Sequence, residues 1–296
     1  MSNPSGASNP PGAKPLDVQA LRARLVVPAG PYSALDVVSS TGSTNADLHE
    51  LARAGAEDRT VLIAERQTAG RGRRARDWVS PPAVGLYVST LLRPDGIPPN
   101  RLPLVSLLAG VALVRTARTT AGVDAVLKWP NDLLAGPQRA KCAGVLAETS
   151  EGGVVLGMGI NVHPLPADAV PRAGEPAPTS LAEQGATTTD RTELAVALLL
   201  TLSRLDARWR LAYGDAVACG LLDTYREYCA TLGMRVRVEL PGDRELVGTA
   251  VDIDREGRIV VHTDGAGRQA VYAGDVVHLR PAAGQPRYGE GVTSGE

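Results

Sequence analysis

The hydrophobic pattern of the chain changes at Gly233. Beyond this glycine, apolar and polar residues alternate in the segments MRVRVEL, ELVGTAVDID, RIVVHT and QAVYAG, and turn residues separate these segments. A period of two is typical of strands that bury one face. We therefore expect a small antiparallel β-barrel or sandwich at 234–281.

The preceding part, residues 15–233, has a different texture. Helical and strand patterns follow one another without regular βαβ alternation, which favours an α+β domain over a doubly wound one. We expect helices after residue 45 and at 102–121, 190–213 and 218–231, and strands at 60–65, 85–93, 125–129, 132–135, 141–148 and 154–162. Loops are expected at 67–82 and 163–178. Residues 1–14 and 282–296 contain little to bury, so both tails are predicted to be disordered.

Composition excludes several classes of protein. The formal net charge of -1 over 296 residues argues against nucleic-acid binding by the whole chain. The three cysteines, Cys142, Cys219 and Cys229, form no C-x-x-C pair, so we expect reduced thiols rather than a metal site. Neither a signal peptide nor an apolar stretch approaching the ~18 residues of a membrane span is expected. We interpret the chain as a soluble cytoplasmic protein.

The segment 65–78, ERQTAGRGRRARDW, carries the most informative chemistry. Gly70 and Gly72 allow backbone N–H groups to approach a ligand closely. The interleaved arginines, Arg71 and Arg73 among them, suit a phosphate or a carboxylate. Gln67 offers an amide and Trp78 a stacking plane, which favours a small polar ligand. The alternatives are a solvated basic loop and an RNA-contacting Arg-Gly segment.

The segment Lys128-Trp129-Pro130-Asn131-Asp132 predicts a turn at the end of a strand. Pro130 disfavours a helical conformation of the residue before it. Asn131 and Asp132 supply oxygen ligands of the kind that Mg²⁺ prefers. The alternative is an ordinary turn, for which Pro-Asn-Asp is also a common sequence.

Three shorter segments are ambiguous when taken singly. Lys141 with Gly144 begins a strand, and such a lysine either holds a ligand oxygen or is merely solvated. Gly157 and Gly159, followed by Asn161, mark either close approach of a ligand or a β-bulge. The segment 43–45, Ser-Thr-Asn, either caps a helix or also presents its free N–H groups to a ligand.

The order of these motifs resembles the biotin protein ligase family. Ser-Thr-Asn, Gln-x-x-Gly-Arg-Gly-Arg-Arg, Lys-Trp-Pro-Asn-Asp, Lys-x-Ala-Gly and Gly-x-Gly-Ile-Asn follow one another between residues 43 and 162. The resemblance implies the mixed-sheet catalytic domain of biotin and lipoate ligases at 15–233 and a small SH3-like β-barrel at 234–281. It also implies the short form, without the N-terminal DNA-binding domain of some members.

The resemblance implies an enzyme that joins biotin to ATP as biotinyl-5′-AMP and then transfers biotin to a lysine. The implied partner is the biotin carboxyl carrier domain of an acyl-CoA or acetyl-CoA carboxylase, and we expect a monomer that binds neither DNA nor membranes. The implied catalytic residues are Arg73, Asp132 and Lys141, and Asn131 and Asp132 are the implied contacts of the Mg²⁺ carried by ATP. The implied ligand-binding residues are Ser43, Thr44, Asn45, Gln67, Gly70, Arg71, Gly72, Arg73, Trp78, Lys128, Asn131, Lys141, Gly144, Gly157, Gly159 and Asn161.

One position departs from the family pattern. Ala75 stands where the family loop has glycine, and a left-handed backbone there would cost roughly 1 kcal/mol. The alternatives to a biotin ligase are a lipoate or octanoate ligase or transferase, an RNA-binding protein that uses residues 71–76, and a biotin-binding regulator. The arginine loop and the Lys-Trp-Pro-Asn-Asp motif disfavour the first, the net charge disfavours the second, and the missing DNA-binding domain disfavours the third.

Overall fold

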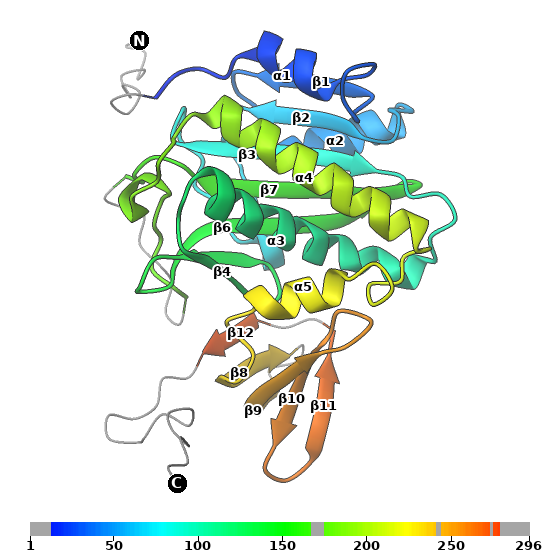
Figure 1. Ribbon diagram of the computed structural model, residues 1–296, viewed down its shortest axis with the longest axis vertical. Helices are drawn as coiled ribbons and strands as arrows, with labels where there is room; N and C mark the ends of the chain where they lie inside the picture. Colours follow the sequence, from blue (N-terminus) through cyan, green and yellow to red (C-terminus); the bar gives the residue numbers. More distant parts are fainter. Residues whose placement is uncertain (1–12, 167–174, 241–243, 273–274, 279–296) are drawn as a thin grey trace, which may run out of the picture.

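The computed structural model describes residues 13–166, 175–240, 244–272 and 275–278. These residues form two sheets, one of seven strands and one of five (Figure 1). The expected tail at 282–296 lies outside the described residues, as do residues 1–12 of the expected tail at 1–14. The chain is an α+β protein with a separate C-terminal sheet, as the change of pattern at Gly233 predicts.

The large sheet is mixed. Its strand order is β1-β2-β3-β7-β6-β5-β4, in which β1 and β2 are parallel and the other neighbouring pairs are antiparallel. Both β2 and β3 are buried along their whole length, so both faces of the sheet are covered at this point. The strands are β1 (Ala34–Val38), β2 (Thr60–Ala64), β3 (Gly85–Leu92), β4 (Ala125–Lys128), β5 (Asp132–Ala135), β6 (Ala140–Ser150) and β7 (Gly153–Asn161).

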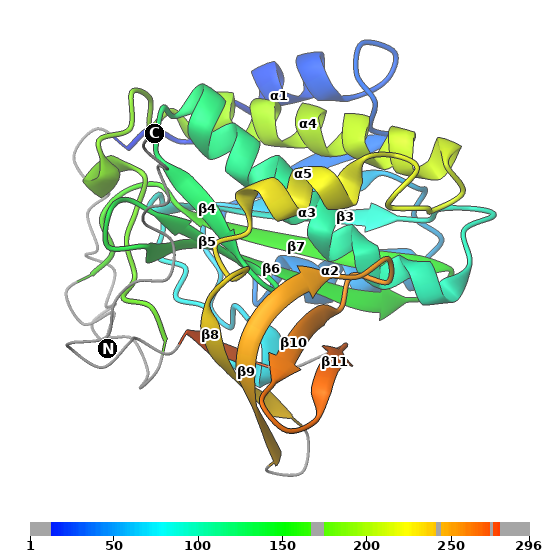
Figure 2. The same cartoon turned by 60° about the horizontal axis from the view of Figure 1, so that its bottom comes forward.

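Different helices cover the two faces of this sheet. The helices α1, α3, α4 and α5 lie on one side and α2 lies on the other (Figure 2). Neighbouring residues of β2 show the division, because Val61 and Ile63 join the main core whereas Leu62 packs with Leu48 of α2. Successive side chains of a strand point to opposite faces, so the two cores alternate along it. The helices are α1 (Val18–Leu25), α2 (Thr44–Arg53), α3 (Val105–Arg115), α4 (Arg191–Leu211) and α5 (Leu221–Tyr228).

The main core surrounds α3. Between Val105 and Val114 every residue except Ser106 is buried. With the flanking 3₁₀-helix η2 (Pro99–Leu104) and π-helix η3 (Thr116–Thr120), this helix is long and apolar enough to cross a membrane by length and composition alone. The expectation that no apolar stretch approaches that length is therefore wrong. Packing of α3 against the sheet, α4 and α5 accounts for its apolar composition.

Two elements near the N-terminus have no clear signal in the sequence. The helix α1 buries only Leu21 and Leu25, and the edge strand β1 buries only Leu35. So few apolar positions do not establish a period. The helix expected at 218–231 is also shorter than predicted, because α5 ends at Tyr228 and turns then lead to the second sheet.

The second sheet is antiparallel throughout, with the order β11-β10-β9-β8-β12. Alternate residues such as Val236, Val238 and Val261 are buried, as a period of two requires. The predicted antiparallel β domain is thus confirmed, and the pairings among the described residues form an open order of five strands. These are β8 (Arg235–Leu240), β9 (Arg244–Ile253), β10 (Ile259–Thr263), β11 (Gly267–Val271) and β12 (Asp275–His278).

The second sheet is held to the first near the turn between β4 and β5. Trp129 is buried, and its backbone N–H donates to Thr231 Oγ1 at 3.0 Å. The indole N–H of Trp129 donates to the carbonyl of Gly257, also at 3.0 Å. On α5, Arg226 Nε donates to Asp252 of β9 at 2.9 Å. The tryptophan of the Lys-Trp-Pro-Asn-Asp motif is therefore a structural link between the sheets.

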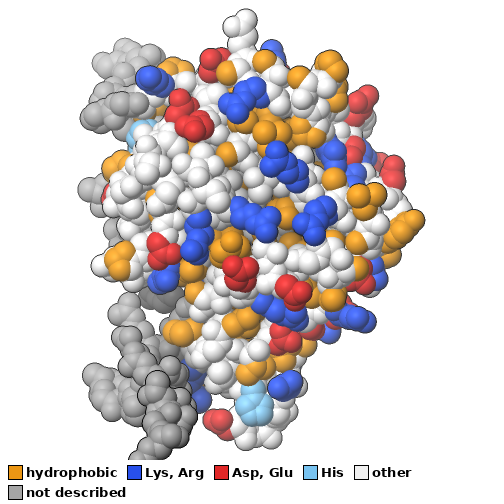
Figure 3. Space-filling model, viewed as in Figure 1, with side chains coloured by type: hydrophobic (Ala, Val, Ile, Leu, Met, Phe, Trp, Pro, Cys, Tyr) orange, Lys and Arg blue, Asp and Glu red, His pale blue; other side chains and the backbone are white. Residues whose placement is uncertain are grey.

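The outer surface of the helical layer carries mixed charge. Figure 3 shows Lys and Arg side chains gathered over α3, α4 and α5, with acidic and apolar side chains among them. The predicted ligand-binding residues lie elsewhere. A second cavity on these helices is lined by Arg115, Thr119, Thr201, Arg204, Leu205 and Arg208.

Candidate active site

A cavity of about 410 Å³ lies on the α2 side of the large sheet, beneath the 67–82 loop and beside the second sheet. This volume lies within the usual range of small-molecule sites. Gly70 is the one predicted ligand-binding residue that does not line the cavity. It lies against the hairpin backbone, where a Cβ would be 2.6 Å from the carbonyl oxygen of Trp78. The predicted residues that line the cavity are Ser43, Thr44, Asn45, Gln67, Arg71, Gly72, Arg73, Trp78, Lys128, Asn131, Asp132, Lys141, Gly144, Gly157, Gly159 and Asn161.

The floor of the cavity is a patch of small residues on three adjacent strands. Ser89 of β3 lies opposite Gly157 of β7, and Gly159 lies opposite Gly144 of β6. Residues two apart on a strand share a face, so the spacing of these residues directs them all toward α2. Two motifs that are far apart in the sequence, together with Ser89, thereby form one surface.

The two β7 glycines make room for side chains of the chain itself. A Cβ on Gly157 would lie 2.3 Å from Asn45 Oδ1, and a Cβ on Gly159 would lie 2.6 Å from Trp78 Nε1. Real side chains do not tolerate such distances. The predicted close approach at these glycines is therefore made by Asn45 and Trp78, which stand directly over the sheet.

Trp78 divides the cavity. Its ring lies above Gly159 and Gly144, and Lys141 Nζ is 5.7 Å from the ring centre. The indole nitrogen is buried and has no hydrogen-bond partner among the described residues. Because an indole N–H can only donate, it is available to an acceptor atom of a ligand.

On one side of Trp78 lies a group of uncharged residues, Thr44, Asn45, Gln67 and Ser89, which we call the neutral end. Gln67 Oε1 accepts a hydrogen bond from the backbone N–H of Thr44 at 2.9 Å. Ser43 precedes α2 but makes no side-chain cap, so the expected cap by Ser43 or Thr44 is supplied by Gln67 instead. The side chain of Gln67, which is distant in sequence, thus caps the first turn of α2.

Short hydrogen bonds join the neutral end into a chain. Thr44 Oγ1 lies 2.7 Å from Ser89 Oγ, and Ser89 donates to Asn45 Oδ1 at 2.6 Å. Asn45 Nδ2 in turn donates to Glu148 Oε2 at 2.7 Å. Thr44, Asn45 and Ser89 are buried, so the hydrogen bonds among them fix their orientation before any ligand arrives, whereas the Glu148 side chain at the end of the chain is 41% exposed.

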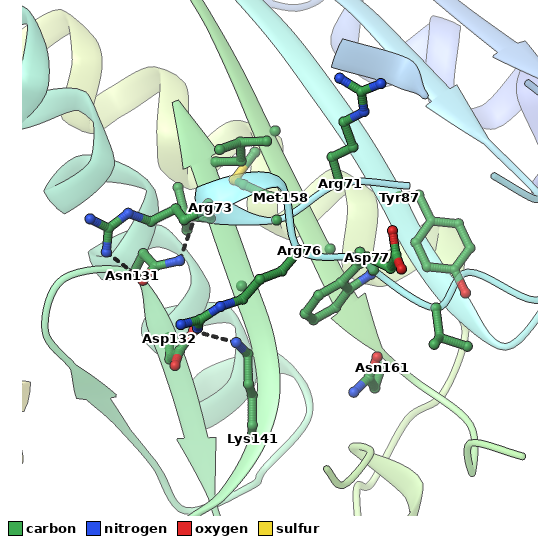
Figure 4. Close-up of a pocket in the computed structure, with 18 of the residues that line it drawn as sticks. Arg71, Arg73, Arg76, Asp77, Tyr87, Asn131, Asp132, Lys141, Met158 and Asn161 are labelled. Carbon is green, nitrogen blue, oxygen red and sulfur yellow. Dashed lines mark hydrogen bonds and ion pairs between the residues drawn. The ribbon is translucent and has the colours of Figure 1, made fainter. Parts of the chain in front are cut away.

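On the other side of Trp78 lies the cationic end, formed by Arg73, Lys128, Asp132 and Lys141. Figure 4 shows Arg73, Asp132 and Lys141 in this part of the cavity. Lys141 Nζ is 2.7 Å from Asp132 Oδ1, and Lys128 Nζ is 3.8 Å from Asp132 Oδ2. Lys128 and Asp132 are both buried. One carboxylate therefore holds two ammonium groups, and their combined charge remains positive.

The residues predicted to contact Mg²⁺ are engaged with protein groups. Asn131 Oδ1 accepts from Arg73 at 3.4 Å, and Asn131 Nδ2 donates to the carbonyl of Val145 at 3.0 Å. Asp132 is paired with the two lysines. No group of three or more His, Cys, Asp or Glu side chains that could hold a metal ion occurs among the described residues. Asn131 and Asp132 are thus a pair of oxygen donors and not a complete cluster of metal ligands.

The loop above the cavity forms a narrow hairpin. Trp78 N–H donates to Gly70 O at 2.9 Å, and Gly72 N–H donates to Arg76 O at 2.6 Å. The turn at its tip is η1 (Arg73–Ala75), in which Arg74 has a φ of 54°. The left-handed residue is therefore Arg74 and not Ala75, so the cost considered for alanine at position 75 does not arise.

The arginines of this loop reach different parts of the chain. Arg74 lies 3.5 Å from Glu239 Oε2 on β8, and Arg76 lies 2.7 Å from Glu175 Oε1. Figure 4 shows Arg73 beside Asn131, whereas Arg71 points away from Asp132 and Lys141. Ion pairs thus attach the loop to β8 of the second sheet and to Glu175, which lies outside both sheets.

Some residues of the site belong to no sequence motif and were therefore not predicted. Ser89 and Tyr87 lie two apart on β3, and a strand pattern alone predicts only that they share a face. The Tyr87 hydroxyl donates to Pro81 O at 3.0 Å, and burial raises the pKa of this phenol above its usual range. Asn161 does line the cavity, but its amide donates to Thr179 O at 2.9 Å and so also secures a neighbouring segment.

Comparisons with known proteins agree with this geometry. The sequence profile described as the biotin/lipoate A/B protein ligase family matches residues 35–164, and the profile of the biotin protein ligase C-terminal domain matches residues 231–279. The chain is 42% identical over 271 residues to the biotin–[acetyl-CoA-carboxylase] ligase of Mycobacterium tuberculosis, covering 90% of this chain and 97% of that protein.

A more distant relative and a solved structure extend the likeness. The chain is 33% identical to the bifunctional ligase/repressor BirA of Bacillus subtilis, covering 81% of this chain and 72% of that protein. It superimposes on the biotin protein ligase of Aquifex aeolicus in complex with biotin and ATP with a TM-score of 0.69 and 27% identity, covering 84% of this chain and all of the other. The chain therefore belongs to the biotin protein ligase family.

Proposed function

We propose that the protein activates biotin with ATP and transfers the biotinyl group to a lysine of a biotin carboxyl carrier domain. One observation carries the proposal: a single cavity joins a neutral, hydrogen-bonded end to a cationic end. Biotin has an uncharged ureido ring at one end and a carboxylate at the other. ATP adds its phosphates on the carboxylate side, where cations are needed.

The cationic end lowers the barrier of the first step. A carboxylate oxygen of biotin attacks the α-phosphorus of ATP, the bond to the β-phosphate breaks, and pyrophosphate leaves with the electron pair. Two anions approach each other in this step, so fixed positive charge stabilises the transition state. Lys141 and Arg73 are suited to contact the reacting oxygens, and Lys128 adds charge nearby. Asp132 is a positioning residue, because it holds both ammonium groups in place.

In the second step the chain has two tasks, which are to hold the activated carbonyl in place and to exclude water. The amine of the carrier lysine attacks the activated carbonyl, AMP leaves with the bonding electrons, and the amine loses a proton. Water competes with this amine, so a covered cavity protects the acyl-adenylate. The 67–82 hairpin supplies the cover, and its arginines bind the anion that lies below.

The remaining predicted residues fit this reaction. Gln67, Ser43, Thr44 and Asn45 are suited to the ureido ring, and Trp78 forms the wall between the ring and the adenylate, with Gly70 and Gly72 shaping the loop. Arg71 borders the cavity and adds to its positive charge. Gly144, Gly157, Gly159 and Asn161 form the floor and its edge.

We assign the Mg²⁺ contacts to the side-chain oxygens of Asn131 and Asp132, which border the cationic end. Such a pair fits an ion that arrives on ATP and keeps most of its ligands from phosphate and water. Bound there, Mg²⁺ would offset charge on the departing pyrophosphate. Arg73, Lys128 and Lys141 are cations that the chain itself supplies at this end.

The arrangement of the chain supports a two-domain interpretation. We assign residues 15–233 to a catalytic domain and 234–281 to a C-terminal domain, which we interpret as an SH3-like barrel, with tails at 1–14 and 282–296. Glu239 and Val276 of the C-terminal sheet border the cavity. This domain therefore stands where it can contact ATP or the carrier.

The partner and setting follow from the same proposal. The carrier is a biotin carboxyl carrier domain of an acetyl-CoA or other acyl-CoA carboxylase, and the enzyme acts as a monomer in the cytoplasm, without DNA or a membrane.

Release of pyrophosphate tests the function directly. The protein, ATP and Mg²⁺ are mixed with biotin, lipoate or octanoate, with and without a carrier domain. We expect pyrophosphate release with biotin and biotinylation of the carrier lysine. Release that depends on lipoate but not on biotin would overturn the proposal.

A further inference from the structure

Glu148 places a carboxylate at the far end of the neutral hydrogen-bond chain. It lies on β6, and its Oε2 accepts from Asn45 Nδ2 at 2.7 Å. His49 Nε2 lies 3.8 Å from the same oxygen, while His49 Nδ1 lies 3.2 Å from Ser150 Oγ. Glu148 is not part of the cavity wall. Its influence on a ligand must therefore pass through Asn45.

The carboxylate fixes which way the Asn45 amide faces. The amide nitrogen is directed at two groups that can only accept, Glu148 Oε2 and the carbonyl of Leu146 at 3.3 Å. Turning the amide over would set its oxygen against both acceptors. Asn45 Oδ1 therefore faces Ser89, which must donate the 2.6 Å hydrogen bond between them.

The direction then passes along the hydroxyl groups, because there are too few hydrogens for every contact. Thr44 and Ser89 have one hydroxyl hydrogen each, so together they can donate two hydrogen bonds. Their hydroxyl groups make three contacts that each need a hydrogen: Ser89 to Asn45 at 2.6 Å, Thr44 with Ser89 at 2.7 Å, and Thr44 to Gln67 at 3.1 Å. Ser89 donates its hydroxyl hydrogen to Asn45, so Thr44 must be the donor in the contact between Thr44 and Ser89. Gln67 Oε1 already accepts from the Thr44 backbone N–H.

With every hydrogen directed toward Asn45, the free lone pairs of Thr44, Ser89 and Gln67 remain for a ligand. We propose that Glu148, acting through Asn45, orients the hydroxyl groups of the neutral end so that this end presents hydrogen-bond acceptors. The matching ligand group carries N–H donors, as a cyclic urea does. Glu148 is thus a positioning residue that sets the specificity of the site.

This inference rests on the proposed function, and it explains selection against an acid that lacks N–H groups. Oriented acceptors in a buried pocket bind a matching donor and are left unpaired by a ligand without one. Octanoate and lipoate carry the carboxylate but no N–H group. Loss of Glu148 should therefore weaken binding of biotin while leaving the binding of octanoate unchanged.

The test compares Glu148→Ala and Glu148→Gln with the unchanged enzyme. Pyrophosphate release is measured while biotin and ATP are varied in turn, and octanoate is titrated as a competitor of biotin. For Glu148→Ala we expect the KM for biotin to rise about tenfold, the size expected for one hydrogen bond to a charged group. The KM for ATP, the kcat and the inhibition constant of octanoate should stay within about twofold.

Glu148→Gln serves as the conservative variant. The glutamine oxygen can still accept from Asn45, so most of the biotin affinity should return. Glu50→Ala is the matched control, because Glu50 lies on α2, is exposed and pairs with Arg53. It should leave both ligands unaffected. Thermal unfolding of each variant separates a folding defect from a change in specificity.

Three results would overturn the inference. One is an unchanged KM for biotin in Glu148→Ala, and another is an equal loss for biotin and octanoate. The third is a uniform fall in kcat that follows the loss of thermal stability, which would make Glu148 a merely structural residue. Failure of the proposed function is a separate result, because the unchanged enzyme would then release no pyrophosphate with biotin.

Discussion

The two ends of the cavity solve different problems with different groups. The neutral end uses buried hydroxyl and amide groups at hydrogen-bond distance, and its geometry is fixed by a continuous chain of contacts. The cationic end uses ammonium and guanidinium groups around Asp132, partly covered by a hairpin. Hydrogen bonds depend steeply on position, whereas charges act over longer distances and are weakened by salt.

The contrast separates selection from acceleration. A neutral network recognises a ring by the direction of its donors and acceptors, and it contributes equally to the ground state and the transition state. Fixed cations interact most strongly where negative charge develops, so they act on the rate. Changes at the neutral end should therefore alter the KM for biotin, and changes at the cationic end should alter kcat.

Lys141→Ala should have the largest effect. We expect adenylate formation to fall by about a hundredfold, a typical consequence of removing one group that stabilises the transition state. Asp132 also loses its nearest partner, at 2.7 Å. Single-turnover pyrophosphate release measures the rate, and calorimetry measures biotin binding, which should change little.

Arg139→Ala is the control for this variant, because Arg139 is a nearby cation that pairs with Asp124 on the surface. Near-normal turnover in Lys141→Ala would show that this lysine is only a solvated partner of Asp132. A large loss of biotin affinity without a loss of rate would remove the proposed division between the two ends.

Gly157→Ala should damage the neutral end. The new Cβ would lie 2.3 Å from Asn45 Oδ1, so Asn45 must move away from Ser89. We expect the KM for biotin to rise at least tenfold, with a smaller change in the KM for ATP. Gly42→Ala is the matched control, since a Cβ there meets nothing within 4 Å. Equal effects on both substrates would mean that the sheet itself is distorted.

Arg73→Gly should weaken the hairpin that covers the cavity, and it should leave the strand surface at the floor of the cavity unchanged. Arg73 belongs to the hairpin and contacts Asn131 at 3.4 Å across the cavity. Without it the adenylate should dissociate several-fold faster, and free lysines should be biotinylated without a carrier. Trapping radiolabelled biotinyl-AMP on a filter gives the off-rate. An unchanged off-rate would place the retention of the intermediate elsewhere.

Removing the ion pair between the hairpin and the second sheet should have the smallest effect. Arg74 and Glu239 are both more than one-third exposed, and such pairs contribute little. In a double-mutant cycle with Arg74→Ala and Glu239→Gln, we expect a coupling of less than about 1 kcal/mol in adenylate retention. A larger coupling would show that the C-terminal sheet holds the cover closed.

Much of the contrast between the neutral and the cationic end can be predicted from the sequence, because it depends on local sequence features. The arginine-glycine loop, the turn after β4 and the strand patterns at 85–93 and 154–162 each depend on a few consecutive residues. They indicate an anion-binding loop, a strand end and a buried face. The absence of regular βαβ alternation predicts an α+β domain, the family resemblance implies its mixed sheet, and the alternation after Gly233 predicts the second sheet.

Other features have no local signal. The role of Ser89 depends on its register with Gly157, and the role of Glu148 depends on a contact with Asn45 more than a hundred positions away. Trp129 belongs to a motif that indicates ligand binding, yet its backbone and its ring link the two sheets. The left-handed residue of the hairpin is Arg74, which the family pattern at position 75 does not predict.

The sequence by itself determined the residue types and the family, because motif order and hydrophobic period are properties of neighbouring positions. Only the tertiary structure decided how these residues are partnered. Strand register brings Ser89, Gly157 and Gly144 onto one face, and chain packing sets Glu148 against Asn45. The direction of a buried hydrogen-bond chain depends on which group stands at its end, and that group is chosen by the fold.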